Sequence, residues 1–320
     1  MSDAVDAIER ALAGLVDAVA GVAVGWLVLG VALHLANQAA RGRGWYAVVR
    51  TACGGETTPR RRDVLAAWVA GAGAGGVVSA RGGDALRIIL LNRRMPGNKA
   101  VLTGTLVAET AGESALGAAL LALALALGVG PSLAPSTQTV LYVLAGVLAL
   151  SGAVLIGRRH RRVRGFISRV ACGCSSLRSP RRYAREVLPW QVLSRLLRFA
   201  SLFCFLAAFH LPATFAAILL VTFAQCGGRL VPFSPAAVGA GTAILAACFE
   251  PVTGTSVPAS QLAAFFVGTS TVLTVVGTVL ALAICLKSAA AQASANAGPS
   301  EERVRVGRLM RIRAAMVPRP

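Results

Sequence analysis

The sequence predicts an all-α, polytopic membrane protein, and three observations support this fold class. Of the 320 residues, 56% are hydrophobic and only 14% are charged, whereas soluble domains carry roughly 25% charged residues. The mean hydropathy is +0.68. Apolar runs recur along the whole chain, close to the ~20 residues that cross a bilayer as a helix. We expect about six to eight hydrophobic segments, including one or two re-entrant or broken helices, at residues 18–36, 64–80, 102–129, 138–157, 190–209, 212–228, 230–249 and 261–286.

The chain divides into an integral membrane domain, residues 1–290, and a basic cytoplasmic tail, residues 291–320. An Ala/Ser-rich stretch from Ser288 leads into the tail, and such a composition is typical of a flexible linker. Because few residues follow the last apolar segment, we expect no further large cytoplasmic domain in this polypeptide.

The chain is strongly basic, with a formal net charge of +19 and an isoelectric point near 11.4. In a soluble protein this excess would suggest nucleic acid as a partner. Here the arginines lie in the gaps between apolar runs, where the positive-inside rule places them. The partner that they indicate is the anionic cytoplasmic leaflet, and we expect no binding of nucleic acid.

Charge also predicts the orientation of the chain in the membrane. Residues 1–17 hold four acidic side chains and one arginine, so the N-terminus should lie outside. The segments 41–63, 81–99 and 158–189 are rich in arginine and should lie inside, as should the C-terminal tail. The segments before and after 64–80 should therefore both lie on the cytoplasmic side of the membrane. A glycine-rich re-entrant segment meets that requirement, and the alternative is a crossing helix with one loop that breaks the charge rule.

One basic stretch, residues 164–179, has two interpretations. It can form an amphipathic helix that lies on the membrane surface with its arginines on anionic lipid. It can equally be a solvated basic loop, and the sequence leaves both open.

Two acidic residues lie inside an apolar segment. Glu109 and Glu113 are one turn apart and share one face of a helix. Buried charges in a membrane are costly and indicate function by default, so the pair should face a polar interior. It either lines a substrate cavity or neutralises buried arginines. Arg198 is the deeper of two arginines in its helix and can pair with a glutamate or a phosphate, whereas snorkelling to the surface is sufficient for Arg195.

A second broken region spans residues 224–245. Gly227, Gly228 and Pro232 interrupt an apolar stretch that also carries Arg229. Pro235 can open a new helix, because the N–H that proline lacks has no partner at that end. The free N–H groups near Ser234 would then favour a phosphate or carboxylate. The alternative is a proline kink with a snorkelling arginine.

Three short motifs resemble those of the lysylphosphatidylglycerol synthase transmembrane region, also called the flippase-like integral membrane proteins. "ARGGDALR" resembles "PARxGExxR", "ETAGE" resembles "ERxxD", and "PFSPAAVG" resembles "PxSPGGxG". The motifs occur in the family order, and the resemblance covers roughly residues 15–290. The positions that the resemblance carries over are Arg81, Gly83, Asp84, Arg87, Glu109, Glu113, Pro232, Ser234, Pro235 and Gly239.

The sequence also departs from the family pattern. Ser79 replaces a proline, Thr110 replaces an arginine, and alanines at 236–237 replace a glycine pair. Thr242 stands where a glutamate usually follows, and the last helix, residues 263–277, lacks an expected arginine. A glutamate–arginine pair of typical members is therefore absent as a unit.

The resemblance implies movement of lipids between leaflets. The leading hypothesis is a lipid flippase for a phospholipid or a polyprenyl-linked polar head group, with membrane lipids as partners. Arginine suits a phosphate because guanidinium binds it bidentately. We expect head-group binding at the inner surface by Arg81, Asp84 and Arg87, and a polar groove lined by Glu109, Glu113, Arg198 and Arg229.

Two further function classes remain open. A non-catalytic scaffold subunit would dock a lipid- or glycan-modifying enzyme through segment 158–189 and the tail. A membrane-embedded transferase would need Glu109 and Glu113 as its catalytic carboxylates. The sequence offers no nucleophile–base pair, metal cluster or phosphate-binding Gly-Lys loop, so we expect no enzyme activity, no cofactor and no metal. The oligomeric state is left open.

Overall fold

The computed structural model describes residues 21–53, 59–77, 80–94, 99–126, 161–228 and 234–315. Within these ranges the chain forms helices and no strand, so the all-α prediction is confirmed for them. In chain order the elements are α2 (Val24–Ala52), α3 (Arg61–Val77), α4 (Ala80–Arg94), α5 (Lys99–Ala126), α7 (Arg161–Gly173), the 3₁₀ helix η1 (Cys174–Arg178), α8 (Pro180–Glu186), α9 (Leu188–Ala208), α10 (Phe215–Gly228), α11 (Ser234–Thr253) and α12 (Ala259–Ala315).

Two described helices are long and apolar enough to cross a bilayer, judged by length and composition. They are α9 and the first part of α12, Ala259–Ala290. Every predicted hydrophobic segment that falls on described residues coincides with a helix, whereas 138–157 lies outside the described residues. α11 begins one residue before Pro235, as expected for a proline that opens a helix.

Two segments expected as cytoplasmic loops are largely helical. α2 continues through Ala52, so Arg41 lies on a helix rather than in a loop. Residues 80–94 form α4, which packs against α3 as the second limb of a helical hairpin. α2 can continue to Arg41 because no helix-breaking residue lies between its apolar run and that position. α4 is helical because its charged residues leave one side apolar, and that side packs in the core through Leu90 and Leu91.

The hairpin of α3 and α4 is held by close glycine contacts. A Cβ added at Gly83 would overlap the backbone carbonyl of Gly71 and lie 2.9 Å from the Cα of Gly75. α3 has 17 residues and α4 has 15, about 25 and 22 Å at 1.5 Å per residue. Each limb is therefore shorter than the ~30 Å hydrocarbon core of a bilayer.

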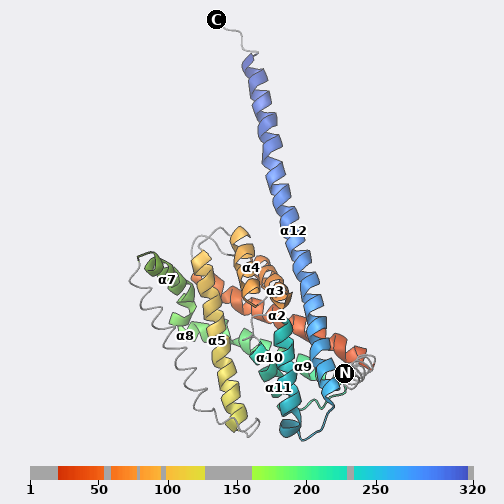
Figure 1. The fold of residues 1–320 in the computed structure, drawn as a ribbon. Coiled ribbons are helices and arrows are strands. Elements are labelled where there is room, and N and C mark those ends of the chain that lie inside the picture. The colour runs from red at the N-terminus through yellow and green to blue at the C-terminus, as the bar shows by residue number, and fades with distance from the viewer. Residues whose placement is uncertain are drawn as a thin grey trace.

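α12 supports the hairpin along one side. Gly73 of α3 meets the backbone of Gly277, and Gly76 lies beside Thr274. Thr274 is 15 residues after the first residue of α12 (274 − 259), or about 22 Å along its axis. A substantial part of the apolar half of α12 thus extends past the closed end of the hairpin. The opposite half projects away from the other helices (Figure 1).

Two buried apolar clusters hold the helices together. One joins α9, α10, α11 and α12 around Phe205, Phe249 and Phe265. The other joins α2, α3, α4 and α5 around the buried indoles of Trp45 and Trp68, whose ring centroids are 5.6 Å apart. The second cluster lies directly beside the polar side chains described next.

No helical break marks the predicted domain boundary at residue 290. α12 continues without interruption from Ala259 to Ala315. The Ala/Ser-rich stretch expected to act as a linker is therefore helical in this structure, which follows from the high helix propensity of its alanines.

Candidate functional site

Arg41 is the central charge of a polar cluster between four helices. Its Nη2 atom contacts Oε1 of Glu109 at 3.4 Å and also contacts Oε2 of Glu113. The Arg41 side chain is only 14% exposed, and that of Glu109 is 5% exposed. α2 supplies the arginine and α5 supplies both acids, so one guanidinium neutralises two buried carboxylates. Sequence reasoning missed Arg41 because it placed the residue in a loop.

Glu109 and Glu113 point into the protein from one face of α5, as their spacing indicates. The neighbouring helix α9 holds the same two turns through their backbone. Gln191 donates to the carbonyl oxygen of Glu109 at 3.3 Å, and Arg195 donates to that of Glu113 at 3.0 Å. The donors are four residues apart on α9, and the acceptors are four residues apart on α5. The two helices therefore match in register.

Arg195 belongs to this cluster, and its assignment as a snorkelling residue was wrong. Its Nη2 atom lies 3.7 Å from Oε1 of Glu113, and its side chain is 17% exposed. Glu113 thus lies between Arg41 and Arg195. Glu113 attracts the Arg195 guanidinium more strongly in these partly buried surroundings than it would in water, because the effective dielectric constant is lower there.

Arg87 joins the cluster through Trp68. The guanidinium carbon of Arg87 lies 3.9 Å from the centroid of the Trp68 ring, and that of Arg41 lies 5.1 Å from it. Arg87 also pairs with Asp84 at 2.7 Å, and Asp84 is half exposed. The indole N–H of Trp68 donates to Gln38 at 3.2 Å. The ring is thereby fixed where it can hold two cations close to each other.

The arginine–carboxylate cluster, as we call this group, is balanced in formal charge. It contains three guanidinium groups and three carboxylates, from Arg41, Arg87, Arg195, Asp84, Glu109 and Glu113. Within the part of the chain that the structure describes, the Nε atoms of all three arginines are buried and have no hydrogen-bond partner. A buried donor that lacks a partner costs free energy. An oxygen acceptor that reached one of these Nε atoms would remove that cost.

The other residues singled out in the sequence make different contacts or lie outside the residues that the structure describes. Arg198 donates to Gln225 of α10 at 2.6 Å. Gly83 is buried at the α3–α4 contact, and Gly239 is exposed on α11. Arg81, Ser234 and Pro235 belong to helices, but their side chains are outside the described part, and Arg229 and Pro232 lie wholly outside it.

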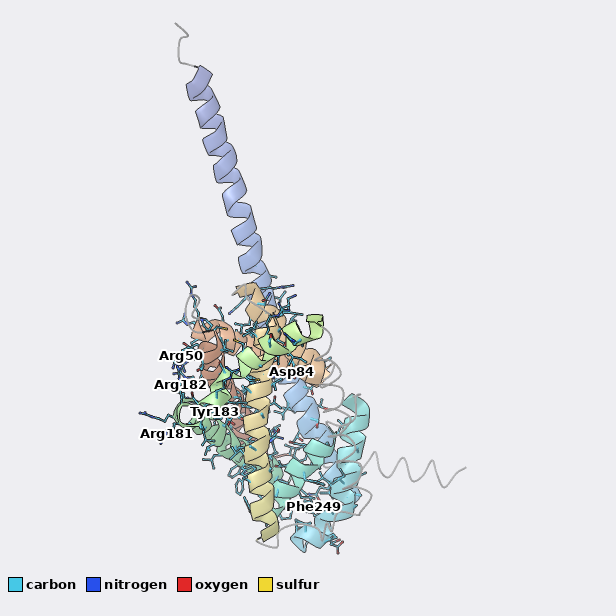
Figure 2. All side chains as sticks on the ribbon, turned by 90° about the vertical axis from the view of Figure 1, so that its left-hand side faces the viewer. Arg50, Asp84, Arg181, Arg182, Tyr183 and Phe249 are labelled. Carbon is cyan, nitrogen blue, oxygen red and sulfur yellow. The ribbon has the colours of Figure 1, made fainter. Side chains whose placement is uncertain are left out.

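Figure 2 shows the relation between the cluster and the rest of the molecule. Asp84 lies beside the upper part of α5, whereas Arg181 extends outward from α8 and Phe249 lies near the opposite end of the bundle. Asp84, the half-exposed member of the cluster, therefore lies toward one end of the described helices. This is the end from which α12 projects (Figure 1).

Comparison with known protein families identifies the family of this chain. Residues 9–281 match the family described as "Lysylphosphatidylglycerol synthase TM region". The chain belongs to this family. No curated protein and no solved structure matches this chain. The lysylphosphatidylglycerol synthase TM family is a family of membrane regions, so membership indicates a membrane protein with a lipid-related function.

The three motifs of this lysylphosphatidylglycerol synthase TM region lie in α4, in α5 and at the start of α11. The first two motifs, in α4 and α5, come together through Arg41 and Trp68. The third begins α11, whose described residues pack with α9, α10 and α12 in the phenylalanine-rich cluster. Thr110 stands where the family pattern has an arginine. In this structure Arg41 supplies a charge partner for Glu109 from another helix.

Proposed function

We propose that this family member is a lipid flippase of the bacterial inner membrane. It binds the head group of an anionic or polyprenyl-phosphate-linked lipid at the arginine–carboxylate cluster and moves it between leaflets, while the hydrocarbon chains stay in the bilayer. It acts without chemical catalysis. The observation that carries this proposal is the pair of guanidinium groups, from Arg41 and Arg87, at the same indole ring.

A phosphate is the ligand that this arrangement favours. Guanidinium groups bind phosphate oxygens through charge-assisted hydrogen bonds, and the buried Nε atoms of Arg41 and Arg87 have no hydrogen-bond partner among the described residues. Asp84 is half exposed, so it can return to water when Arg87 turns to a phosphate. Exchange of one anion for another then costs little.

We further propose that α3 and α4 form a re-entrant hairpin that enters from the cytoplasmic side. The limbs are too short to cross, and both open ends carry arginines, at Arg61 and Arg93. The closed end stops beside Thr274, well before the first residue of α12. A hairpin of this depth would carry Arg87 to a level between the head groups and the membrane centre, where a head group entering from the cytoplasm meets it.

Replacement of Arg87 by alanine tests the transport function. We expect Arg87→Ala to slow the flipping of fluorescent phosphatidylglycerol in proteoliposomes by about tenfold to a hundredfold, the value of one lost charge-assisted hydrogen bond. Stability should fall as well, because the Arg87 side chain is only 13% exposed and packs on the Trp68 ring, so flipping rates are compared at equal amounts of folded protein. Arg93→Ala, which removes an exposed arginine from the same helix, should flip lipid like wild type. Equal rates for wild type and Arg87→Ala, at equal insertion, would overturn the proposal.

The projecting half of α12 favours a second candidate function, a scaffold subunit for a lipid- or glycan-modifying enzyme. Deletion of residues 291–320 separates the two candidates. A flippase should keep its full rate of lipid movement, since the arginine–carboxylate cluster lies in α2–α9. A scaffold should instead lose a co-purifying enzyme while any lipid movement remains, and loss of lipid movement in the truncated protein would contradict the flippase assignment.

A further inference from the structure

α7 is attached to α5 by a direct backbone contact. A Cβ added at Gly104 would overlap the carbonyl oxygen of Val170 and lie 2.9 Å from the Cα of Gly173. The thiol of Cys174 donates to the carbonyl oxygen of Gly104 at 3.3 Å. Only glycine permits two helices to meet so closely, so the C-terminal end of α7 is fixed in position on α5.

The helical form of this segment excludes the solvated loop considered in the sequence analysis. α7 ends at Gly173 and is followed by η1, so the helix is shorter than the predicted 164–179. Its apolar side is packed at Val170 and Gly173, where it meets α5. The same side continues away from α5 to Phe166, which is 49% exposed. Arg164 and Ser168 lie on the opposite side and are exposed.

The segment around α7 carries an unbalanced positive charge. Between residues 161 and 186 the sequence has one acidic residue, Glu186. That carboxylate is already engaged by Arg50 and Arg182 at 3.0 and 3.2 Å. Partial burial alone would raise the pKa of Glu186, but hydrogen bonds from these two arginines hold it below its usual value. The remaining exposed arginines of the segment are Arg164, Arg169, Arg178, Arg181 and Arg185.

We propose that α7 is a membrane-surface anchor that lies on anionic phospholipid of the cytoplasmic leaflet. Phe166 inserts below the head groups beside α5, Arg169 reaches the lipid phosphates at the border, and Arg164 and Ser168 face water. An exposed aromatic side chain on the apolar side of a basic helix is typical of interfacial binding. The net positive charge of the segment fits an anionic surface, to which each arginine adds attraction. The inference does not depend on lipid transport.

The anchor would fix the depth of the arginine–carboxylate cluster. Glu109 follows Gly104 by five residues along α5 (109 − 104), about 7.5 Å at 1.5 Å per residue. With α7 at the head-group level, the buried glutamates lie just below that level. A lipid head group would therefore need to move only a short distance inward to reach them.

Site-specific labelling of the full-length protein tests the anchor. Phe166→Cys and Ser168→Cys are made separately in a Cys172→Ser parent, which removes the exposed native thiol of α7. Each is labelled with bimane in nanodiscs that contain phosphatidylglycerol. We expect a blue-shifted emission at position 166 and a several-fold lower iodide quenching constant there than at position 168. The identically labelled parent provides the background from the other cysteines.

Lipid composition and a matched charge variant complete the test. The protection at position 166 should weaken in phosphatidylcholine nanodiscs and in Arg164→Gln/Arg169→Gln. It should persist in Arg61→Gln/Arg62→Gln, which removes the same charge from the exposed start of α3. Equal iodide quenching at positions 166 and 168 would overturn the proposal. So would protection that is insensitive to anionic lipid, since α7 would then be covered by protein.

Discussion

Replacement of Arg41 by alanine is expected to lower the free energy of unfolding by about 3–5 kcal/mol, the typical cost of removing one partner of a buried ion pair. Arg41 is the guanidinium shared by Glu109 and Glu113, and without it the 5%-exposed Glu109 is left without the partner that neutralises it. Denaturant titration of the purified protein in detergent measures the loss. Lipid flipping should fall below detection in the same variant.

A control on the same helix separates burial from charge. Arg50 of α2 pairs with Glu186 at 3.0 Å but is 44% exposed, so Arg50→Ala should cost no more than about 1 kcal/mol. The combination of Arg41→Leu with Glu109→Gln removes one charge of each sign and leaves Glu113 paired with Arg195, so it should recover much of the stability without restoring lipid movement. If Arg41→Ala and Arg50→Ala were equally stable, the buried cluster described here would be wrong.

Replacement of Gly83 by alanine is expected to destabilise the hairpin by about 4 kcal/mol or more, a loss associated with overpacking and strain. The added methyl group would overlap the backbone carbonyl of Gly71, which cannot rotate away as a side chain can. The limbs of the hairpin would have to separate and carry Arg87 away from Trp68. We therefore expect loss of lipid flipping as well as a lower midpoint in thermal denaturation.

Gly239 provides the matched substitution. It lies inside α11, and a Cβ there would meet nothing within 4 Å. Gly239→Ala should therefore stabilise the protein by up to about 1 kcal/mol, because alanine has the higher helix propensity. Opposite signs for the two Gly→Ala variants are the expected result. A Gly83→Ala protein with wild-type stability would show that α3 and α4 are not in contact at this point.

The sequence was most informative where a residue conflicts with its surroundings. Glu109 and Glu113 interrupt an apolar run, and their spacing of one turn predicted a shared inward direction that the contacts to Arg41 confirm. Pro235 likewise indicated where a helix begins. In both cases the signal is local, because it depends on helical period or on the missing N–H of proline.

Tertiary partners could not be read in the same way. Arg41 and Arg195 lie near the ends of apolar runs, where positive charge is ordinarily cytoplasmic, and only the acids on α5 cause these two to point inward. The role of Trp68 depends on the packing of α2 and α4, the helices before and after α3, against its ring. One available signal was the absence of a helix-breaking residue between the first apolar run and Arg41, which allows α2 to continue.

The charge balance of the cluster restricts what can enter it. Three positive and three negative groups sum to zero in the empty protein. An anionic head group that arrived by itself would leave an uncompensated negative charge in a poorly hydrated space, which is strongly unfavourable. Electroneutrality therefore requires either that Asp84 turns to water as the head group binds, or that a companion enters: a proton on one of the carboxylates, an inorganic cation, or a positive group on the head group itself.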